Sequence, residues 1–330
     1  MKTVKAVPPY IHPEQLNFKT APYEAWMKLG GEVAPAHYPP RLLHGFAFHY
    51  EIPKLTSIFN FQFSTFNLSK EARLRFVEPI SITFDTFPDY AFYEIIPFVW
   101  DCWPCYFERM CRWLKKHNVR TAIFTSSQTA ERMRAGFPKM NIMFCPEAVD
   151  STLYNSGKNL NERSIDLLEF GRGNEKIFDA SQLSTVNHVR TVVNGKFTYT
   201  NEELYHAMGD AKVTITLPRS YTQPEIAGDI ETLTQRYWEC MLSRMVMVGH
   251  APKELTDLIG YNPVIELDMD NPKEQILQII THINDYQELV DKNLEAARVH
   301  GDWYTRMKDV MRFIEEHDYH IDIKLQEPQE

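Results

Sequence analysis

The sequence predicts an α/β protein made of two halves, each built on an open and mainly parallel sheet. Short apolar runs rich in β-branched residues alternate with amphipathic segments from Ile80 onward, a pattern typical of βα units. With 330 residues, the chain is long for one domain and comfortable for two. A polar stretch at 155–163 separates the two series of strands and helices. We therefore expect domains at 1–150 and 151–301, followed by a helix and tail at 302–330.

The N-terminal half gives weak signals at first and clear ones later. Residues 1–40 are rich in proline and aromatic residues, so we expect only a short strand near Val4 and a helix at 23–29. Alternation of apolar and polar residues predicts strands or an extended lip at 42–50 and 57–66. The later elements are predicted as strands at 80–87, 93–101, 120–127 and 140–150, with helices at 106–117 and 129–135. About four strands of this sheet are thus clear.

The C-terminal half follows the same alternation. We expect strands at 164–170, 212–217 and 245–248, and helices at 201–208, 232–244, 273–298 and 303–317. The helix at 232–244 is predicted because that run contains neither glycine nor proline.

Composition and charge exclude several classes of protein. No run approaches the roughly 20 apolar residues of a membrane span, so we expect a cytoplasmic protein. Five scattered cysteines do not form a disulfide framework. The net charge is +3 over residues 1–150 and −12 over residues 151–330. The acidic C-terminal half argues against a nucleic-acid partner, because phosphate backbones require a basic surface.

Two carboxylates stand out around the helix predicted at 232–244. Glu231 lies at its start and Glu239 two turns in, with seven residues between them. Gln235 and Arg236 precede Glu239 by one turn and should share its face. The apolar strand before this helix ends at a loop, where parallel sheets bind ligands. A carboxylate in such a position suits a ligand rich in hydroxyl groups better than phosphate alone.

These residues carry a resemblance to a known family. The E-x7-E spacing, the Glu-Cys-Met that follows, the turn at 249–252 and the run Glu-Leu-Thr-Asp-Leu-Ile-Gly at 254–260 resemble the donor half of GT-B glycosyltransferases. Among these enzymes the resemblance is to the retaining group-1/family-4 type, and it covers residues 149–303. It implies two Rossmann-like domains with parallel sheets facing across a cleft. It also implies sugar transfer from a UDP- or GDP-linked donor, with retention and without a metal or other cofactor.

The resemblance assigns roles to individual positions. Glu239 would hold the nucleotide ribose and Glu231 the transferred sugar, while Arg236 matches an R-x-x-E arrangement of a divergent branch. The family usually places a Gly-Phe-Gly-like segment after its first glutamate, whereas this chain has Thr-Leu-Thr at 232–234. Because backbone approach is easier for glycine, this departure affects the predicted contacts to the sugar.

Further positions of the resemblance concern the diphosphate. The predicted strand at 164–170 is followed by Gly171 and Arg172, and Lys176 is a candidate second cation. Fixed cations stabilise the negative charge that grows on the leaving diphosphate. A turn at Pro218 places Arg219 and Ser220 near the donor, and the longer loop at 221–230 either shapes sugar choice or is a surface loop.

Two aspartates in the N-terminal half follow predicted strands. Asp101, and less strongly Asp85, would hydrogen-bond an acceptor hydroxyl or remove its proton, which makes Asp101 a candidate catalytic residue. The alternative for Asp101 is a cap of the next helix or a turn former. His44 and His49 are more simply core or surface residues.

The helix at 106–117 is basic and amphipathic, and Arg120 extends its positive charge. We consider peripheral contact of 106–120 with the inner face of a membrane, or with a lipid-linked acceptor, against simple packing of its aromatic residues on the sheet. Cys102 and Cys105 have C-x-x-C spacing, but neither a matching zinc pair nor a thioredoxin-type context accompanies them. Chance spacing of thiols is the favoured interpretation.

The sequence thus predicts a hexosyltransferase-like enzyme of polysaccharide or glycoconjugate biosynthesis. Its acceptor would be a glycan, a lipid-linked saccharide or a small-molecule glycoside. One alternative is a non-catalytic nucleotide-sugar binding protein on the same scaffold. Another is an NAD(P)-dependent oxidoreductase that uses Gly-Arg-Gly-Asn-Glu-Lys at 171–176 as an incomplete dinucleotide fingerprint.

Overall fold

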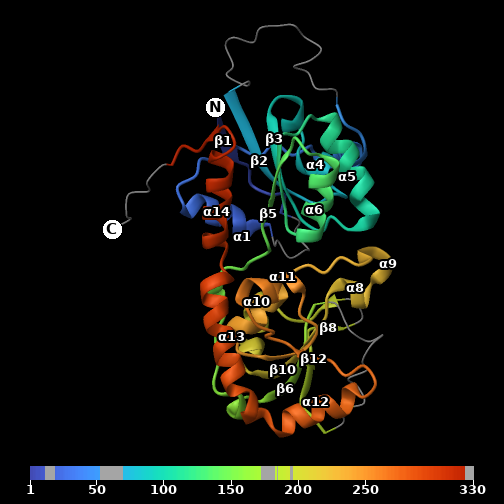
Figure 1. The fold of residues 1–330 in the computed structure, drawn as a ribbon, viewed down its shortest axis with the longest axis vertical. Coiled ribbons are helices and arrows are strands. Elements are labelled where there is room, and N and C mark those ends of the chain that lie inside the picture. The colour runs from blue at the N-terminus through green and yellow to red at the C-terminus, as the bar shows by residue number, and fades with distance from the viewer. Residues whose placement is uncertain (12–18, 53–69, 172–182, 184, 194–195, 324–330) are drawn as a thin grey trace. The chain divides into compact units, whose positions relative to one another are not determined.

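The computed structural model describes residues 1–11, 19–52, 70–171, 183, 185–193 and 196–323 (Figure 1). The chain divides into two compact units, the first formed by 1–146 with 303–330 and the second by 147–302. Each described unit is an α/β layer structure with a parallel sheet, which confirms the predicted fold class. No helix in the described ranges is both long and apolar enough to cross a lipid bilayer.

Unit 1 contains a six-stranded parallel sheet with the order β13-β1-β2-β3-β4-β5. The strands are β1 (Lys2–Ala6), β2 (Glu71–Val77), β3 (Glu94–Val99), β4 (Thr121–Phe124), β5 (Asn141–Phe144) and β13 (Tyr319–His320). Strands β2 to β4 are buried along almost their whole length, as expected for a sheet with helices on both faces.

Helices cover both faces of the unit 1 sheet (Figure 1). Helices α1 (Thr20–Lys28) and α14 (Trp303–Glu315) pack together on one face, and α5 (Pro104–Lys116) and α6 (Ser127–Gly136) lie on the other. Shorter segments are η1 (Arg41–Leu43), α2 (His44–His49), α4 (Ile82–Asp85) and η3 (Asp89–Ala91). Helix α14 thus returns the end of the chain to the sheet formed by its beginning.

Unit 2 contains a five-stranded parallel sheet with the order β12-β11-β10-β6-β7. Its strands are β6 (Ile165–Glu169), β7 (His188–Arg190), β10 (Ala211–Thr216), β11 (Val246–Gly249) and β12 (Ile265–Glu266), and β8 (Val192–Val193) pairs separately with β9 (Lys196–Phe197).

Two cores lie on opposite sides of this sheet. Helices α7 (Asn201–Gly209), α10 (Gln235–Leu242) and α11 (Lys253–Ile259) contribute to one core and α12 (Pro272–Thr281) to the other. Helix α13 (Gln287–His300) contributes to both, with Leu294 and Ala297 on the first side and Val290 on the second. Val213 and Ile215 of β10 belong to the α12 side, as the two-residue period of a strand requires. The remaining helical segments are α8 (Arg219–Thr222), α9 (Pro224–Ala227), η4 (Ser151–Leu153), η5 (Leu160–Glu162) and η7 (Ile283–Tyr286).

Two predictions for the N-terminal half were wrong. The segment 42–50 forms η1 and α2 instead of a strand, and it contains no β-branched residue that would favour extended backbone. The segment 80–87 contains α4, while the strand before it, β2, was missed. Two arginines, Arg73 and Arg75, interrupt the apolar pattern of β2, yet both are buried. The strand predicted at 57–66 lies outside the described residues.

The helix predicted at 232–244 is shorter than expected. It begins at Gln235 and ends at Leu242, so Glu231 lies in the preceding loop and not at a helix start. Thr232 and Thr234 are β-branched and favour extended backbone, and Thr234 is extended at the N-cap. Gln235, Arg236 and Glu239 do share the less buried face of α10, as predicted.

At the amino edge of the unit 1 sheet, Glu94 forms polar contacts with residues of several neighbouring strands. Its carboxylate accepts two hydrogen bonds from Arg120, at 2.8 Å from Nε and 2.8 Å from Nη2, and pairs with Lys2 Nζ at 2.9 Å. The Tyr319 hydroxyl donates to Glu94 Oε1 at 2.5 Å. Burial acts to raise the pKa of Glu94, but these partners outweigh it and lower the pKa to about 2. One carboxylate thus connects β3 with segments at the starts of β1, β4 and β13.

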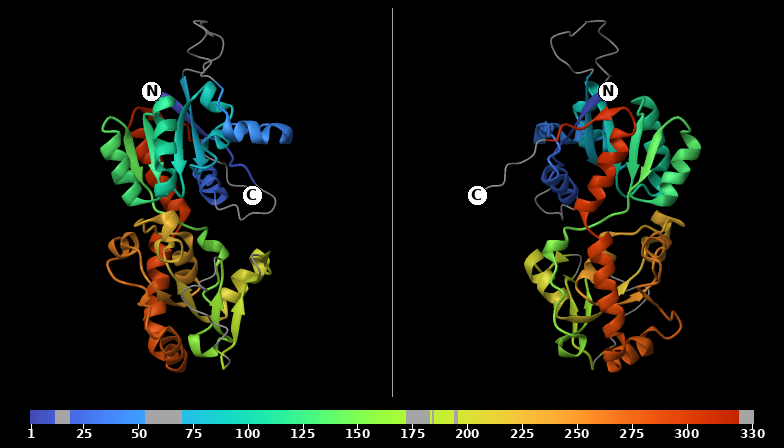
Figure 2. Two further views of the ribbon diagram at one scale, coloured as in Figure 1. Left: turned by 90° about the vertical axis from the view of Figure 1, so that its right-hand side faces the viewer. Right: turned by 60° about the vertical axis from the view of Figure 1, so that its left-hand side comes forward.

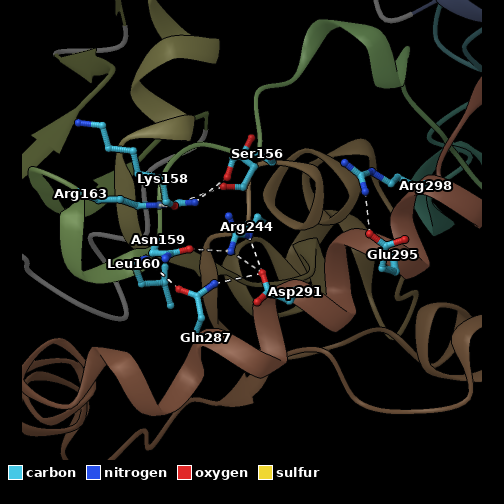
Figure 3. Close-up of polar contacts among 11 residues, drawn as sticks. Ser156, Lys158, Asn159, Leu160, Arg163, Arg244, Gln287, Asp291, Glu295 and Arg298 are labelled. Carbon is cyan, nitrogen blue, oxygen red and sulfur yellow. Dashed lines mark hydrogen bonds and ion pairs between the residues drawn. The ribbon is translucent and has the colours of Figure 1, made fainter.

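Arg163 has the corresponding place in unit 2 (Figure 3). The side chain is 3% exposed and donates through Nη1 to the carbonyls of Ala211 and Ser243, at 2.7 and 2.9 Å. Nε and Nη2 donate to the carbonyls of Lys158 and Ser156. Burial lowers the pKa of Arg163 to about 10, and the four carbonyl contacts offset the cost of burying its charge.

We predict that Arg163→Ala lowers the free energy of unfolding by about 3 kcal/mol, because several buried carbonyls lose their donor. Urea denaturation followed by circular dichroism measures this value. Arg298→Ala is the matched control, since Arg298 forms an exposed ion pair with Glu295 at 2.7 Å (Figure 3). The control should change the value by less than about 0.5 kcal/mol. Equal effects of the two substitutions would contradict the conclusion that the hydrogen bonds of Arg163 stabilise unit 2.

Candidate functional site

The candidate site lies at the carboxyl edge of the unit 2 sheet. Strands β6, β10 and β11 are neighbours and parallel, so their carboxyl ends lie at the same edge. The segments after these ends begin at residues 170, 217 and 250, and α10 begins after the loop 231–234. An edge of this kind, with loops leading into helices, is where open parallel sheets bind ligands.

Arg236 and Gly171 meet closely at this edge. A Cβ atom added to Gly171 would lie 2.2 Å from Arg236 Nη2, and Gly171 has a φ of 72°. Arg236 Cζ lies 5.4 Å from the centre of the Phe170 ring, a cation–π distance. A side chain at position 171 would therefore displace the guanidinium group, and the backbone conformation also favours glycine.

Glu239 lies one turn further along α10 and is held by a tyrosine. The Tyr154 hydroxyl donates to Glu239 Oε1 at 2.9 Å, and the Tyr154 ring packs edge-on against Tyr205 with centroids 5.0 Å apart. Burial raises the pKa of Glu239, while the Tyr154 hydrogen bond and the Arg236 charge act in the opposite direction. The pKa of Tyr154 is raised well above its usual value, mainly by burial, so its hydroxyl remains a donor.

The loop between Glu231 and α10 is fixed by two carboxylates. The Leu233 backbone N–H donates to Glu254 Oε2 at 2.7 Å, and the Gln235 backbone N–H donates to Glu147 Oε2 at 3.2 Å. Leu233 is fully buried in the core that α10 shares with α7 and α13. The Thr-Leu-Thr sequence that departs from the glycine-rich family pattern thus has a structural reason, because Leu233 anchors this loop to the core.

Glu231 belongs to a cluster with His250, Glu266 and Tyr221. His250 Nε2 lies 3.4 Å from Glu231 Oε2, and His250 Nδ1 lies 2.7 Å from Glu266 Oε1. The Tyr221 ring stacks on the imidazole with centroids 5.0 Å apart. Sequence reasoning had placed His250 in a turn of the family pattern without giving it a role. Its position directly after β11 was the available signal.

Arg219 and Ser220 begin α8 after Pro218, at the carboxyl end of β10. Arg219 Nε donates to Gln223 Oε1 at 2.9 Å. The Ser220 Oγ atom is buried and has no hydrogen-bond partner among the described residues. The predicted loop at 221–230 contains α9 and the rest of α8. Arg172 and Lys176, the predicted cations for the diphosphate, lie outside the described residues.

In unit 1, the two aspartates differ. Asp101 follows β3 at the carboxyl edge of the sheet and has a φ of 48°, which is uncommon for a residue other than glycine. It does not cap α5, because Trp103 is at the N-cap and no side chain caps the helix. Asp85 does not follow a strand; it is 5% exposed within α4, where its Oδ2 accepts from Ser81 Oγ at 2.6 Å and pairs with Lys19 Nζ at 3.3 Å.

The cysteines and other metal-ligating residues form no centre in the described ranges. All five cysteines are free, with Cys102 buried and Cys105 exposed. Burial raises the pKa of the Cys102 thiol well above its usual value, which makes it unreactive. No group of three or more His, Cys, Asp or Glu in this part of the chain could hold a metal ion.

Comparison with solved structures identifies the fold. The chain matches Anabaena HepE, crystallised with UDP and glucose, with a TM-score of 0.61 and 10% identity over 96% of this chain and 100% of that one. It matches sucrose-phosphate synthase from Thermosynechococcus elongatus with a TM-score of 0.58 and 11% identity over 96% and 99%. A glycosyltransferase from Rickettsia africae gives 0.55 and 10% over 95% and 98%.

These matches confirm the GT-B fold predicted from the sequence, the fold of the glycosyltransferases among them. At this level of identity the similarity concerns the fold. No family model matches the sequence, and no curated protein matches it.

Proposed function

We propose that the protein transfers a hexose-like sugar from a nucleotide-diphosphate sugar to an acceptor hydroxyl. The observation that carries the proposal is the assembly of Gly171, Arg236 and Glu239 at the carboxyl edge of the unit 2 sheet. The fold supports it, since HepE shares the fold and was crystallised with UDP and glucose. UDP- and GDP-linked sugars are both candidate donors.

Each group would make a contact suited to its chemistry. Glu239, oriented by Tyr154, would accept hydrogen bonds from the ribose hydroxyls. Glu231 would accept from hydroxyls of the sugar. Arg219 and Ser220 lie at the end of the neighbouring strand and would contact the nucleotide or the sugar.

The leaving group sets the electrostatic requirement. Cleavage of the sugar–phosphate bond leaves negative charge on the diphosphate, which cations placed in advance stabilise. Arg236 lies against Gly171 and would supply one positive charge, while Arg172 and Lys176 are proposed as the others. The resemblance to the family further suggests retention of anomeric configuration without a metal ion, and both remain proposals.

We predict that the protein binds one nucleoside diphosphate with micromolar affinity and that Glu239→Gln weakens this binding by about 1–3 kcal/mol, or roughly 5- to 150-fold. The amide keeps the size of the side chain but loses the charged acceptor. Isothermal titration calorimetry with UDP, GDP, ADP and NADH measures the affinities. Glu295→Gln, at an exposed position on α13, is the control and should leave binding unchanged.

Three outcomes of this titration separate the candidate functions. Binding of UDP or GDP that depends on Glu239 supports the proposal. Binding of NADH alone favours the oxidoreductase. Absence of binding, or an unchanged affinity in Glu239→Gln, would show that the donor site is assigned incorrectly.

Asp101 is proposed to hydrogen-bond the acceptor hydroxyl or to take up its proton. We predict that Asp101→Asn lowers the turnover of the tightest-binding nucleotide sugar by about 10²-fold or more, because asparagine cannot accept the proton. The affinity of the Asp101→Asn variant for the nucleotide should equal that of the wild type. Nucleotide release in the presence of acceptor glycosides measures turnover.

Asp318→Asn is the matched control for this experiment, because Asp318 also has a positive φ, at 67°, and is exposed. Asparagine tolerates that backbone region as aspartate does. Equal turnover in Asp101→Asn and wild type would remove Asp101 from the mechanism. Binding of a sugar nucleotide by the wild type without any turnover would favour the non-catalytic binding protein.

We further propose that the acceptor is lipid-linked and lies at the inner face of a membrane, and an apolar surface of unit 1 supports this proposal. Residues 41–50 expose large apolar side chains, with Leu42 98% and Phe46 51% accessible. The left-hand view of Figure 2 shows α2, in light blue, projecting from the side of the unit. Glu51, just after this helix, pairs with Lys116 Nζ at 2.7 Å and His117 Nε2 at 2.9 Å, so the apolar segment adjoins the basic end of α5.

Apolar side chains beside exposed basic ones suit an anionic lipid surface. We predict that the protein sediments with vesicles of phosphatidylcholine and phosphatidylglycerol, and that Leu42→Ser with Phe46→Ser reduces the bound fraction about tenfold. Leu153→Ser is the control, since Leu153 is a 48% exposed apolar residue of unit 2. Equal binding by the double variant and the control would contradict a membrane role for this surface.

A further inference from the structure

We propose that His250, Glu266 and Tyr221 complete the sugar subsite around Glu231 and that His250 determines how strongly the sugar moiety binds. This inference rests on the proposed function and specifies one part of its site. The subsite would take the hydroxyl-bearing face of a hexose attached to a nucleoside diphosphate. His250 and Glu266 were given no role by the sequence pattern, whereas Tyr221 lies in the loop at 221–230 that was considered for sugar choice.

The imidazole ring of His250 lies between two carboxylates. Nε2 is 3.4 Å from Glu231 Oε2 and Nδ1 is 2.7 Å from Glu266 Oε1. An imidazole donates from both nitrogens only when it is protonated, whereas a neutral ring donates from one. His250 Nδ1 is hydrogen-bonded to Glu266, and Nε2 lies at ion-pair distance from Glu231, the carboxylate that is proposed to receive the sugar hydroxyls.

The backbone around His250 is fixed independently of this ring. The His250 N–H donates to the Thr216 carbonyl at 3.0 Å, and the Tyr237 hydroxyl donates to the His250 carbonyl at 2.7 Å. Strands β10 and β11 come very close here, since a Cβ atom on Gly249 would lie 1.7 Å from the Thr216 carbonyl oxygen. The imidazole thus projects from a rigid strand end and not from a loose loop.

Accessibility separates this cluster from a purely structural ion pair. The side chains of His250 and Glu231 are 26% and 28% exposed, and that of Glu266 is 58% exposed. A second histidine–glutamate pair in the chain, His117 with Glu51, has its imidazole only 4% exposed. The His117 ring is therefore closed off by packing, whereas the His250 ring is open to a ligand.

The chemistry of the cluster matches a sugar. The carboxylate oxygens of Glu231 and Glu266 can accept hydrogen bonds from adjacent hydroxyl groups of a sugar. Tyr221 is 40% exposed and stacks on the imidazole at an interplanar angle of 29°, which places an aromatic ring at the border of the cluster. A hexose can form hydrogen bonds to the carboxylates through its hydroxyl groups and can pack its apolar C–H face against the Tyr221 ring.

The test separates the sugar contribution from nucleotide binding. Calorimetry gives the dissociation constants of UDP, GDP, UDP-glucose, UDP-galactose, UDP-N-acetylglucosamine and GDP-mannose for each variant. For the sugar nucleotide that the wild type binds most tightly, the ratio of its affinity to that of the free diphosphate defines the sugar contribution. We expect His250→Ala to lower this ratio about tenfold with the affinity for free diphosphate unchanged.

Companion variants make the result specific. His250→Gln retains one amide donor and should recover part of the ratio, and Glu266→Gln should lower it by less than His250→Ala does. His282→Ala is the control, because His282 is exposed on the same unit and outside the cluster. If His250→Ala does not fold, the test uses His250→Gln and Glu266→Gln. A lower ratio of sugar-nucleotide affinity to free-diphosphate affinity in these two variants supports the proposal, and an unchanged ratio contradicts it.

The outcomes distinguish this inference from the proposed function. A selective loss of the sugar contribution supports it. An unchanged ratio, or an equal loss of affinity for free diphosphate and sugar nucleotide, overturns it while leaving the donor site intact. If no nucleotide binds to the wild type, the proposed function itself fails and this inference fails with it.

Discussion

The parallel arrangement of every strand in the two main sheets is the constraint on which the described structure depends. In such a sheet all strands begin at one edge and end at the other. The two edges can therefore carry different kinds of side chains, structural ones at one edge and functional ones at the other. The amino edges are closed by single buried or half-buried charged groups, Glu94 in unit 1 and Arg163 in unit 2, each with several partners. The carboxyl edges carry the polar side chains proposed to act on substrates.

Surroundings give similar carboxylates different properties in this protein. Glu94 has cations on several sides, and its pKa is lowered to about 2. The pKa of Glu239 is raised by burial, and its contacts are a tyrosine hydroxyl and one nearby arginine. Glu94 therefore has a structural role, in which its ionised carboxylate links neighbouring strands of the unit 1 sheet. Glu239 keeps a carboxylate at the sheet edge where a hydroxyl-bearing ligand would contribute to its solvation.

The loop before α10 shows how a departure from a family pattern can be accommodated. Glycines allow backbone to approach a ligand, whereas here Leu233 enters the core and Glu254 holds its N–H. The backbone is thus positioned by packing and by carboxylate contacts. This solution also leaves Glu231 beside His250, so the first glutamate acquires a partner that the sequence pattern did not indicate.

The sequence by itself determined the α/β class with two halves, the three central strands of the unit 2 sheet (β6, β10 and β11) and the shared face of Arg236 and Glu239, because these depend on local periodicity. The GT-B fold was indicated by the resemblance of motifs to a known family. Sequence reasoning failed at β2, where Arg73 and Arg75 are buried in a strand, and at 42–50, where alternation of residues indicated a strand that is a helix. Only the tertiary structure brought Tyr154 to Glu239, across 85 positions, and Glu266 to His250. Contacts of this kind depend on which strand ends are neighbours in the sheet, and no local pattern of residues encodes that order.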